Sequence, residues 1–203
     1  MSSASSPIKC ALLASDLTSP ETYARDHKGL HAQVTAHRAA RTVRIGPNAV
    51  LAFEDESTVR HQVQEMLRVE QISEPALVQL EIEAFAALIP DGQNLKATLT
   101  LEYADATERR AKTEALVGIA NHVWVRIEGR ARVFATVDAA ADRAAGGAAA
   151  LTHQLTFELG RSGVRELENG SRLTVGIDHD SYHATLLLHD AQRHLLLNDL
   201  HTA

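Results

Sequence analysis

A short segment of this chain places acidic, basic and amide side chains at the spacing of a helix face. His61, Glu65 and Arg68 are four and then three residues apart, Gln64 lies four residues before Arg68, and Glu70 ends the segment. A helix brings such residues onto one polar strip, which could hold an acid/base pair or clamp a carboxylate. The same pattern is typical of a solvated helix face with charge pairs worth about 0.2–0.5 kcal/mol each. On residue chemistry alone this second interpretation is favoured.

A second candidate is the turn at residues 178–183, which reads Asp-His-Asp-Ser-Tyr-His. It groups carboxylates, imidazoles and a phenol at the tip of a predicted hairpin. Loop tips carry functional residues more often than strand interiors do, so Asp178, His179 and Tyr182 are candidate site residues. Asp and Ser are also standard turn residues, and Asp178 could simply bond the backbone two residues on.

A third candidate, His122, lies where a strand is expected to begin. With His179 it is a candidate metal ligand, although a histidine at a strand start is more often a partner for the backbone. A single small-molecule site would require these candidates to converge in one pocket: Glu65, Arg68, His122, His179 and Tyr182.

The eleven histidines of the chain also suggest a metal site elsewhere. His27 and His31 are four residues apart in a predicted helix, a spacing that lets two imidazoles share a metal ion. His37 and Asp26 lie on the same helix, but no third ligand is obvious. Half-exposed histidines on a surface helix explain the pair equally well.

Composition excludes several other function classes. The net charge of -6 and the pI near 6.0 argue against nucleic-acid binding. No apolar run is long enough for a membrane span, and the single Cys10 argues for a reducing cytoplasm. No phosphate-binding glycine loop, nucleophile elbow or cysteine pair is present, so no cofactor is clearly indicated.

The elements that must position these candidates can be read from periodicity, caps and turns. Helices are predicted over residues 20–41, 57–70, 73–89, 107–117, 161–167 and from 190 onward. Strands are predicted over residues 42–45, 49–53, 95–103, 122–128, 132–137, 153–159, 173–178 and 182–188.

These elements predict an α+β fold, in which several helices pack on a largely antiparallel sheet around a single core. The helix over 57–70 is expected to bury Val59, Val63 and Met66 against the strands, with Leu67 at the edge. Residues 1–18 are predicted to be a disordered tail. Residues 19–203 are predicted to form one domain, with a mobile Ala/Gly-rich loop near 139–150.

Several segments together resemble a bacterial family catalogued as domain of unknown function 3501. The most specific are the Gln-x-Gln-Glu-Met-Leu-Arg-x-Glu run at 62–70 and the Gly-Ile-Asp-His turn at 176–179, and the resemblance covers roughly residues 20–190. Further matching stretches are 43–47 with Leu51, 53–54, 88–92, 95–98, 117–119 and 122–124. Two departures are Asp180, where the family usually has proline, and Phe85-Ala86, which replaces a Tyr-Asn pair.

The resemblance implies an uncharacterised protein encoded beside rubrerythrin-like di-iron proteins and iron–sulfur oxidoreductases. We therefore expect a cytoplasmic accessory or binding protein of an iron-dependent redox or peroxide-defence system. Its expected partner is a rubrerythrin-like or iron–sulfur protein. Independently of the resemblance, a homodimer is expected, because the exposed edge strands of such a sheet are often covered by a second copy of the chain. The alternatives are a small enzyme or metal-binding protein that joins the helix strip to the 178–182 turn, or motifs that serve folding only.

Overall fold

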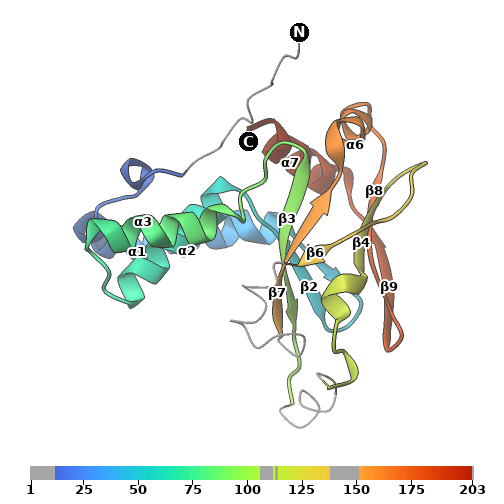
Figure 1. The fold of residues 1–203 in the computed structure, drawn as a ribbon, viewed down its shortest axis with the longest axis horizontal. Coiled ribbons are helices and arrows are strands. Elements are labelled where there is room, and N and C mark those ends of the chain that lie inside the picture. Colours follow the sequence, from blue (N-terminus) through green and yellow to red (C-terminus); the bar gives the residue numbers. More distant parts are fainter. Residues whose placement is uncertain (1–11, 106–111, 113, 138–150, 203) are drawn as a thin grey trace.

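The computed structural model describes residues 12–105, 112, 114–137 and 151–202. It confirms the α+β class (Figure 1). The described elements, in chain order, are η1 (Ala14–Asp16), α1 (Pro20–Ala40), β1 (Thr42–Ile45), β2 (Ala49–Phe53), α2 (Glu56–Val69), α3 (Pro75–Ala86), β3 (Asn94–Leu101), η2 (Ile119–His122), β4 (Val123–Ile127), β5 (Val133–Phe134), β6 (Thr136–Val137), β7 (Thr152–Glu158), α6 (Gly160–Glu168), β8 (Leu173–His179), β9 (Tyr182–Leu187) and α7 (Asp190–Thr202).

The two helices that carry most of the polar candidates begin at well-formed caps. The Ser19 hydroxyl accepts a hydrogen bond from the Thr22 N–H at 3.3 Å, and Pro20 occupies the first turn, where its missing N–H costs nothing. At the start of α2 the Asp55 carboxylate accepts from the Thr58 N–H at 2.8 Å, while the Thr58 hydroxyl accepts from the Asp55 N–H at 3.0 Å. This reciprocal capping box fixes where α2 begins.

The strands form two antiparallel sheets, where the sequence predicted one. Their orders are β1-β2-β3-β7-β6 and β5-β4-β8-β9. The segment predicted as one strand over 132–137 contributes to both sheets, since β5 pairs with β4 whereas β6 pairs with β7. Ala135, buried at the change of partner, donates its N–H to the Val123 carbonyl at 2.8 Å. A segment that changes sheets in this way makes a corner between two packed sheets.

Both sheets enclose one large hydrophobic cluster. Leu51, Leu99 and Val175 contribute to it from three strands. Leu167 of α6 and Leu196 of α7 belong to the same cluster, and these two helices cover one end of the strands (Figure 1). The alternating in-and-out burial along β3 and β7 follows from the period of two residues of a strand with one buried face.

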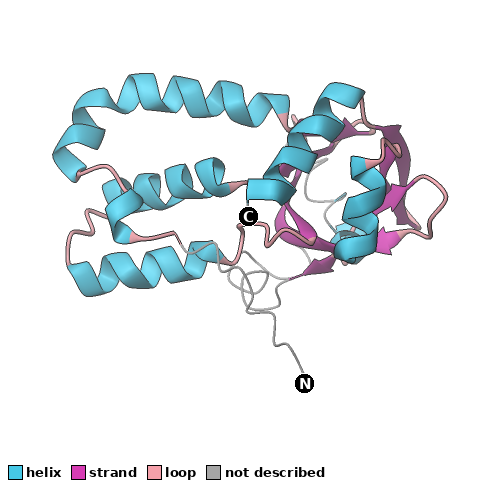
Figure 2. Cartoon of the chain, turned by 90° about the horizontal axis from the view of Figure 1, so that it is seen from above, coloured by secondary structure: helices cyan, strands magenta, loops and turns pink. Residues whose placement is uncertain are grey.

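A second, smaller cluster lies among η1, α2 and α3, so the described core is divided in two rather than single. Leu12, Val59 and Ile82 are among its buried members. Helices α1, α2 and α3 lie side by side, to one side of the strands (Figure 2). An amphipathic helix buries one apolar stripe, and α2 buries its stripe against the neighbouring helical elements.

The inner face of α2 therefore differs from the sequence prediction. Val59 and Val63 are buried as expected, but Met66 is 36% exposed and Leu67 packs against the cluster instead. Residues 59, 63 and 67 are four apart and form one straight stripe, which turns toward α3 and η1 rather than toward strands.

Residues 12–18 also correct the prediction of a tail that extends to residue 18. Leu12 is 4% exposed within the helical cluster, and the Thr18 carbonyl accepts a hydrogen bond from Gln64 Nε2 at 3.3 Å. The loop predicted at 139–150 lies outside the described residues, as do residues 1–11 and much of the helix predicted at 107–117. Among the described residues, no helix combines the length and apolar character that crossing a membrane requires.

Candidate functional site

The predicted site residue His179 has both ring nitrogens engaged by the backbone. The Ser181 N–H donates to its Nδ1 at 3.1 Å, and its Nε2 lies 3.3 Å from the Val117 carbonyl oxygen. A nitrogen that accepts carries no proton, so the proton of the neutral ring is on Nε2 and is donated to Val117. His179 holds the turn after β8 in place, and this arrangement leaves it no lone pair for a metal ion.

His122 lies beside His179 at the start of β4. The two rings meet edge to face, with their centroids 5.0 Å apart, and the His122 Nδ1–H donates to the Asp178 carbonyl at 2.9 Å. The Asp178 carboxylate accepts from Arg132 at 2.6 Å. The exposed His122, Arg132 and Asp178 thus form a polar group around the buried His179, at one end of β8.

The hydroxyl of Tyr182 is saturated by the hairpin that joins β1 to β2. It donates to the Ile45 carbonyl at 2.6 Å and accepts from the N–H groups of Asn48 and Ala49 at 3.1 and 3.0 Å. A hydroxyl has one proton and two lone pairs, so it has no capacity left for a ligand. Gly46, at φ +72°, lets the phenol approach, since a Cβ there would lie 2.8 Å from the hydroxyl oxygen.

The carboxylate of Glu65 on α2 is the centre of a different polar group. Its Oε1 accepts from the Tyr23 hydroxyl at 2.7 Å and from His27 Nε2 at 2.8 Å, both on α1. Arg68, one turn further along α2, donates to Oε2 at 2.9 Å. The Tyr23 hydroxyl oxygen also lies 2.8 Å from Nδ1 of His61. We call these five side chains the α1–α2 cluster.

The other two candidates on α2 lie outside this cluster. Gln64 is buried and holds the segment after η1 through its bond to Thr18. Glu70 is exposed and forms the C-cap of the helix, where its N–H donates to the Met66 carbonyl.

The structure does not bring the five side chains of the proposed joint site together. Glu65 and Arg68 contact α1, whereas His122 and His179 contact each other near the β8–β9 turn, on the other side of the molecule (Figure 1). Tyr182 is directed to the β1–β2 hairpin. The sequence gives each motif but not the distance between them, because it does not determine which elements pack together.

Electrostatics in the α1–α2 cluster favour fixed protonation states. The Arg68 hydrogen bond, aided by Tyr23 and His27, lowers the pKa of Glu65 to about 2. Burial, and then the neighbouring Glu65 carboxylate, raise the pKa of Tyr23 well above its usual value. Burial also lowers the pKa of His61. At neutral pH the cluster holds a carboxylate, a protonated phenol and a neutral imidazole.

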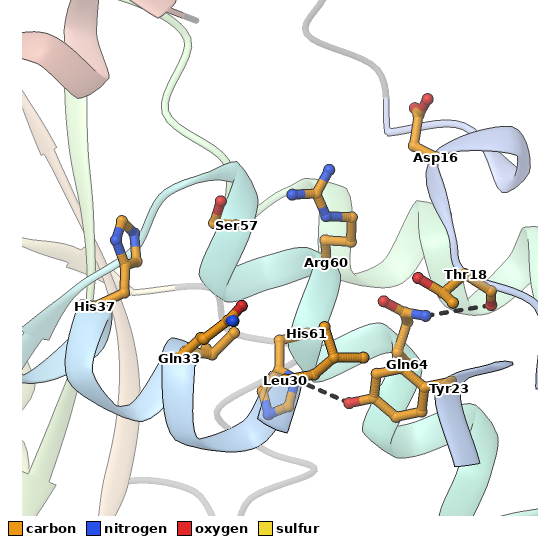
Figure 3. A pocket seen from close by; sticks show the side chains of 11 residues that line it. Asp16, Thr18, Tyr23, Leu30, Gln33, His37, Ser57, Arg60, His61 and Gln64 are labelled. Carbon is orange, nitrogen blue, oxygen red and sulfur yellow. Dashed lines mark hydrogen bonds between the residues drawn. The ribbon is translucent and has the colours of Figure 1, made fainter. Parts of the chain in front are cut away.

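A pocket of about 510 Å³ opens beside this cluster, between α1, α2 and the segment after η1 (Figure 3). Tyr23 and His61 line it, together with Gln64, Arg60 and His37. Figure 3 shows the Tyr23–His61 and Gln64–Thr18 hydrogen bonds along its wall. Its lining offers donors and acceptors from two helices, so it can recognise a polar group.

Sequence reasoning missed Tyr23 and the association of His27 with Glu65. The signal was present as two pairs at four-residue spacing, His27 with His31 and His61 with Glu65. What was missing was the packing of α1 on α2, which also places His31 next to His61, with ring centroids 5.7 Å apart. In the part of the chain that the structure describes, no three side chains of His, Cys, Asp or Glu are already arranged around one point as a metal ion would need.

A separate buried ionic group joins α1 to α2 and α7. Arg41 is 3% exposed and donates to Asp55 at 2.7 Å and to Asp199 at 2.8 Å. Burial raises the pKa of Asp199 to about 6, a rise that the positive charge of Arg41 opposes in part. This group fixes how the helices sit on the sheets, because a buried cation without carboxylate partners is very costly.

Comparison with known proteins agrees with this fold. A crystal structure of a novel protein of unknown function from Burkholderia pseudomallei superposes with a TM-score of 0.86 at 38% sequence identity, covering 93% of this chain and 98% of that chain. No curated protein matches the chain. The model of the family described as protein of unknown function DUF3501 matches residues 11–200, and the chain therefore belongs to that family.

Proposed function

We propose that this protein is a non-catalytic accessory protein that binds its partner at the α1–α2 cluster and the adjoining pocket. The observation that carries the proposal is the Glu65 carboxylate, which three side chains from two helices hold. One of the three, Tyr23, also lines the adjoining pocket. The partner class is the one that the family resemblance implies, a rubrerythrin-like or iron–sulfur protein. The system served is then iron-dependent redox chemistry or peroxide defence in the cytoplasm.

The protonation states of the cluster support binding over acid/base catalysis. An efficient general acid or base has a pKa near the working pH. The pKa of Glu65 is about 2, and that of Tyr23 is raised further from neutrality. A carboxylate whose charge does not change with pH suits electrostatic recognition, for which a partner supplies a complementary cation or hydrogen-bond donor.

The candidate residues of β8 and β9 support the same proposal by elimination. The polar atoms of Tyr182 and His179 are occupied by backbone partners, so these two residues stabilise turns. This leaves the α1–α2 cluster as the candidate with an adjoining pocket. The alternative, a small enzyme or metal-binding protein whose site joins the Glu65/Arg68 helix to the 178–182 turn, lacks such support, because these side chains contact different parts of the fold.

The test is recovery of a partner from native cells with the tagged full chain. We expect the wild-type protein to recover a di-iron or iron–sulfur protein, identified by mass spectrometry and iron content. Glu65→Gln should reduce recovery at least about fivefold, because it removes the charge that the partner meets. Glu70→Gln is the matched control, since the same change is made to an exposed carboxylate at the C-cap of the same helix.

Equal recovery by wild type and Glu65→Gln would remove the cluster from the proposal. Absence of any iron protein from the wild-type eluate would remove the partner class. Circular dichroism of the three proteins excludes loss of fold as the cause of a difference. Light scattering on the same samples tests the predicted homodimer.

A further inference from the structure

We propose that His27, His31 and His61 form a binding site for a divalent first-row transition-metal ion between α1 and α2. The inference goes beyond the accessory role, and it stands whether or not a partner is found. It rests on the distances from the His31 ring to the rings of His27 and His61 and on the hydrogen bonds that orient those two rings.

The three imidazoles lie in a row across the two helices. The ring centroids of His27 and His31 are 5.8 Å apart, and those of His31 and His61 are 5.7 Å apart. A metal ion about 2.1 Å from each ligating nitrogen keeps two imidazole centres about 5 Å apart. The two observed separations, both measured from His31, are within about 1 Å of that value.

Hydrogen bonds determine which nitrogen of His61 is available. The single proton of the Tyr23 hydroxyl is donated to Glu65, so Nδ1 of His61, 2.8 Å from the same hydroxyl oxygen, must be the donor in that contact. Neutral His61 then carries its lone pair on Nε2. An imidazole that donates through one nitrogen and keeps a lone pair on the other is the usual form of a metal ligand.

The same reasoning applies to His27. A carboxylate can only accept, so the His27 Nε2–H donates to Glu65, and the neutral ring keeps its lone pair on Nδ1. Glu65 thereby orients His27 directly and His61 through Tyr23, as the carboxylates behind metal-bound histidines commonly do. None of these hydrogen bonds has to break when a metal ion binds.

His31 is the side chain that must move. It is exposed, and its Nδ1 has a long contact of 3.5 Å with the Thr35 hydroxyl. In its present rotamer the three rings do not surround one point in the described structure, but exposed side chains change rotamer within nanoseconds. Closing the site requires the His31 side chain to change rotamer, and the rings of His27 and His61 to approach the same ion.

The ligand set selects the kind of metal ion. Imidazole nitrogens suit Zn²⁺, Cu²⁺, Ni²⁺ and Fe²⁺, whereas Mg²⁺ and Ca²⁺ require oxygen ligands. Three protein nitrogens leave a fourth position for water or for a group from another molecule. The ionised Glu65 behind the histidines offsets part of the charge of the ion.

The test uses the purified full chain without a polyhistidine tag, freed of metal and titrated with Zn²⁺ in a calorimeter. We expect one equivalent to bind to the wild type. His31→Ala should weaken binding at least about 10-fold, since loss of even an outer-shell partner costs 10- to 100-fold. His189→Ala is the control, because it removes an exposed histidine from another part of the chain. Titration with Co²⁺ should add a visible absorption band that His31→Ala abolishes.

The proposal is overturned if His31→Ala binds Zn²⁺ as tightly as the wild type, or if the wild type does not bind one equivalent. Mg²⁺ in place of Zn²⁺ should give no heat, and equal binding of both ions would also refute the site. Because His31 makes no hydrogen bond to Glu65 among those described, the variant leaves the α1–α2 cluster intact. Lost metal binding with retained partner recovery, or the reverse, therefore separates this inference from the proposed function.

Discussion

The hydroxyl of Tyr182 provides a direct test of whether the 178–182 turn serves folding or binding. Tyr182→Phe removes one oxygen and leaves the ring in place. In the structure that oxygen donates to the Ile45 carbonyl and accepts from two N–H groups, at Asn48 and the buried Ala49. The variant thus leaves three backbone groups of the β1–β2 hairpin without their partner.

The magnitude follows from those three contacts. A hydrogen bond contributes about 0.5–1.5 kcal/mol net, and a buried group left unsatisfied costs about 1–3 kcal/mol. Water can reach the half-buried Asn48, which limits the loss there. We therefore expect Tyr182→Phe to lower the free energy of unfolding by about 2–4 kcal/mol. In a chain of this size that corresponds to a fall in Tm of about 5–15 °C.

Urea unfolding followed by the fluorescence of the single, buried Trp124 measures the change. Thr185→Val, which removes an exposed hydroxyl from the same strand, is the control and should stay within about 0.5 kcal/mol of wild type. A loss below about 0.5 kcal/mol in Tyr182→Phe would refute the structural role. Loss of partner or metal binding at unchanged stability would return Tyr182 to the list of site residues.

Two further predictions test the packing of β8 and the buried ionic group. Gly176→Ala should lower the free energy of unfolding in urea by about 1–3 kcal/mol and shift the emission of Trp124, because a Cβ at that position would overlap the indole ring. For Asp199, burial raises the folded-state pKa from 3.8 to about 6, so the folded protein binds the proton more tightly than the unfolded chain does. The free energy of unfolding should therefore fall by up to about 3 kcal/mol as the pH rises from about 4 to 6. Asp199→Asn should remove that slope when unfolding is measured from pH 4 to pH 7, and a difference from wild type that is constant over this range would contradict the assignment.

Much of the fold could be predicted because its signals are local. Ser19 and Pro20 mark the start of α1, and Asp55 with Thr58 marks the start of α2, since caps act within one turn. Strict alternation over residues 95–101 predicted β3 for the same reason. The division of strands between two sheets could not be predicted, because the partner of each half of 132–137 depends on strands far away in the chain.

The residues of the candidate site also divide into those that local sequence signals predicted and those that depend on packing between distant elements. The sequence supplied Glu65 and Arg68 because they are neighbours on one helix, and it supplied the turn at Asp178 because turn residues are distinctive. It could not supply Tyr23, which is 42 residues from Glu65 and reaches it only because α1 packs on α2. Met66 shows the same limit, since its exposure depends on which neighbour the helix meets.

The position of each polar group relative to the family pattern separates the two proposals. Glu65 and Arg68 lie within the Gln-x-Gln-Glu-Met-Leu-Arg-x-Glu run that carries the family resemblance. The three histidines of the proposed metal site lie outside the matching stretches. The proposed partner surface is therefore only partly built from the shared pattern, because Tyr23, His27 and His61 of the α1–α2 cluster lie outside it. The proposed metal site draws its histidines from both helices, His27 and His31 from α1 and His61 from α2. The Glu65 carboxylate of the shared run orients His27 directly and His61 through Tyr23.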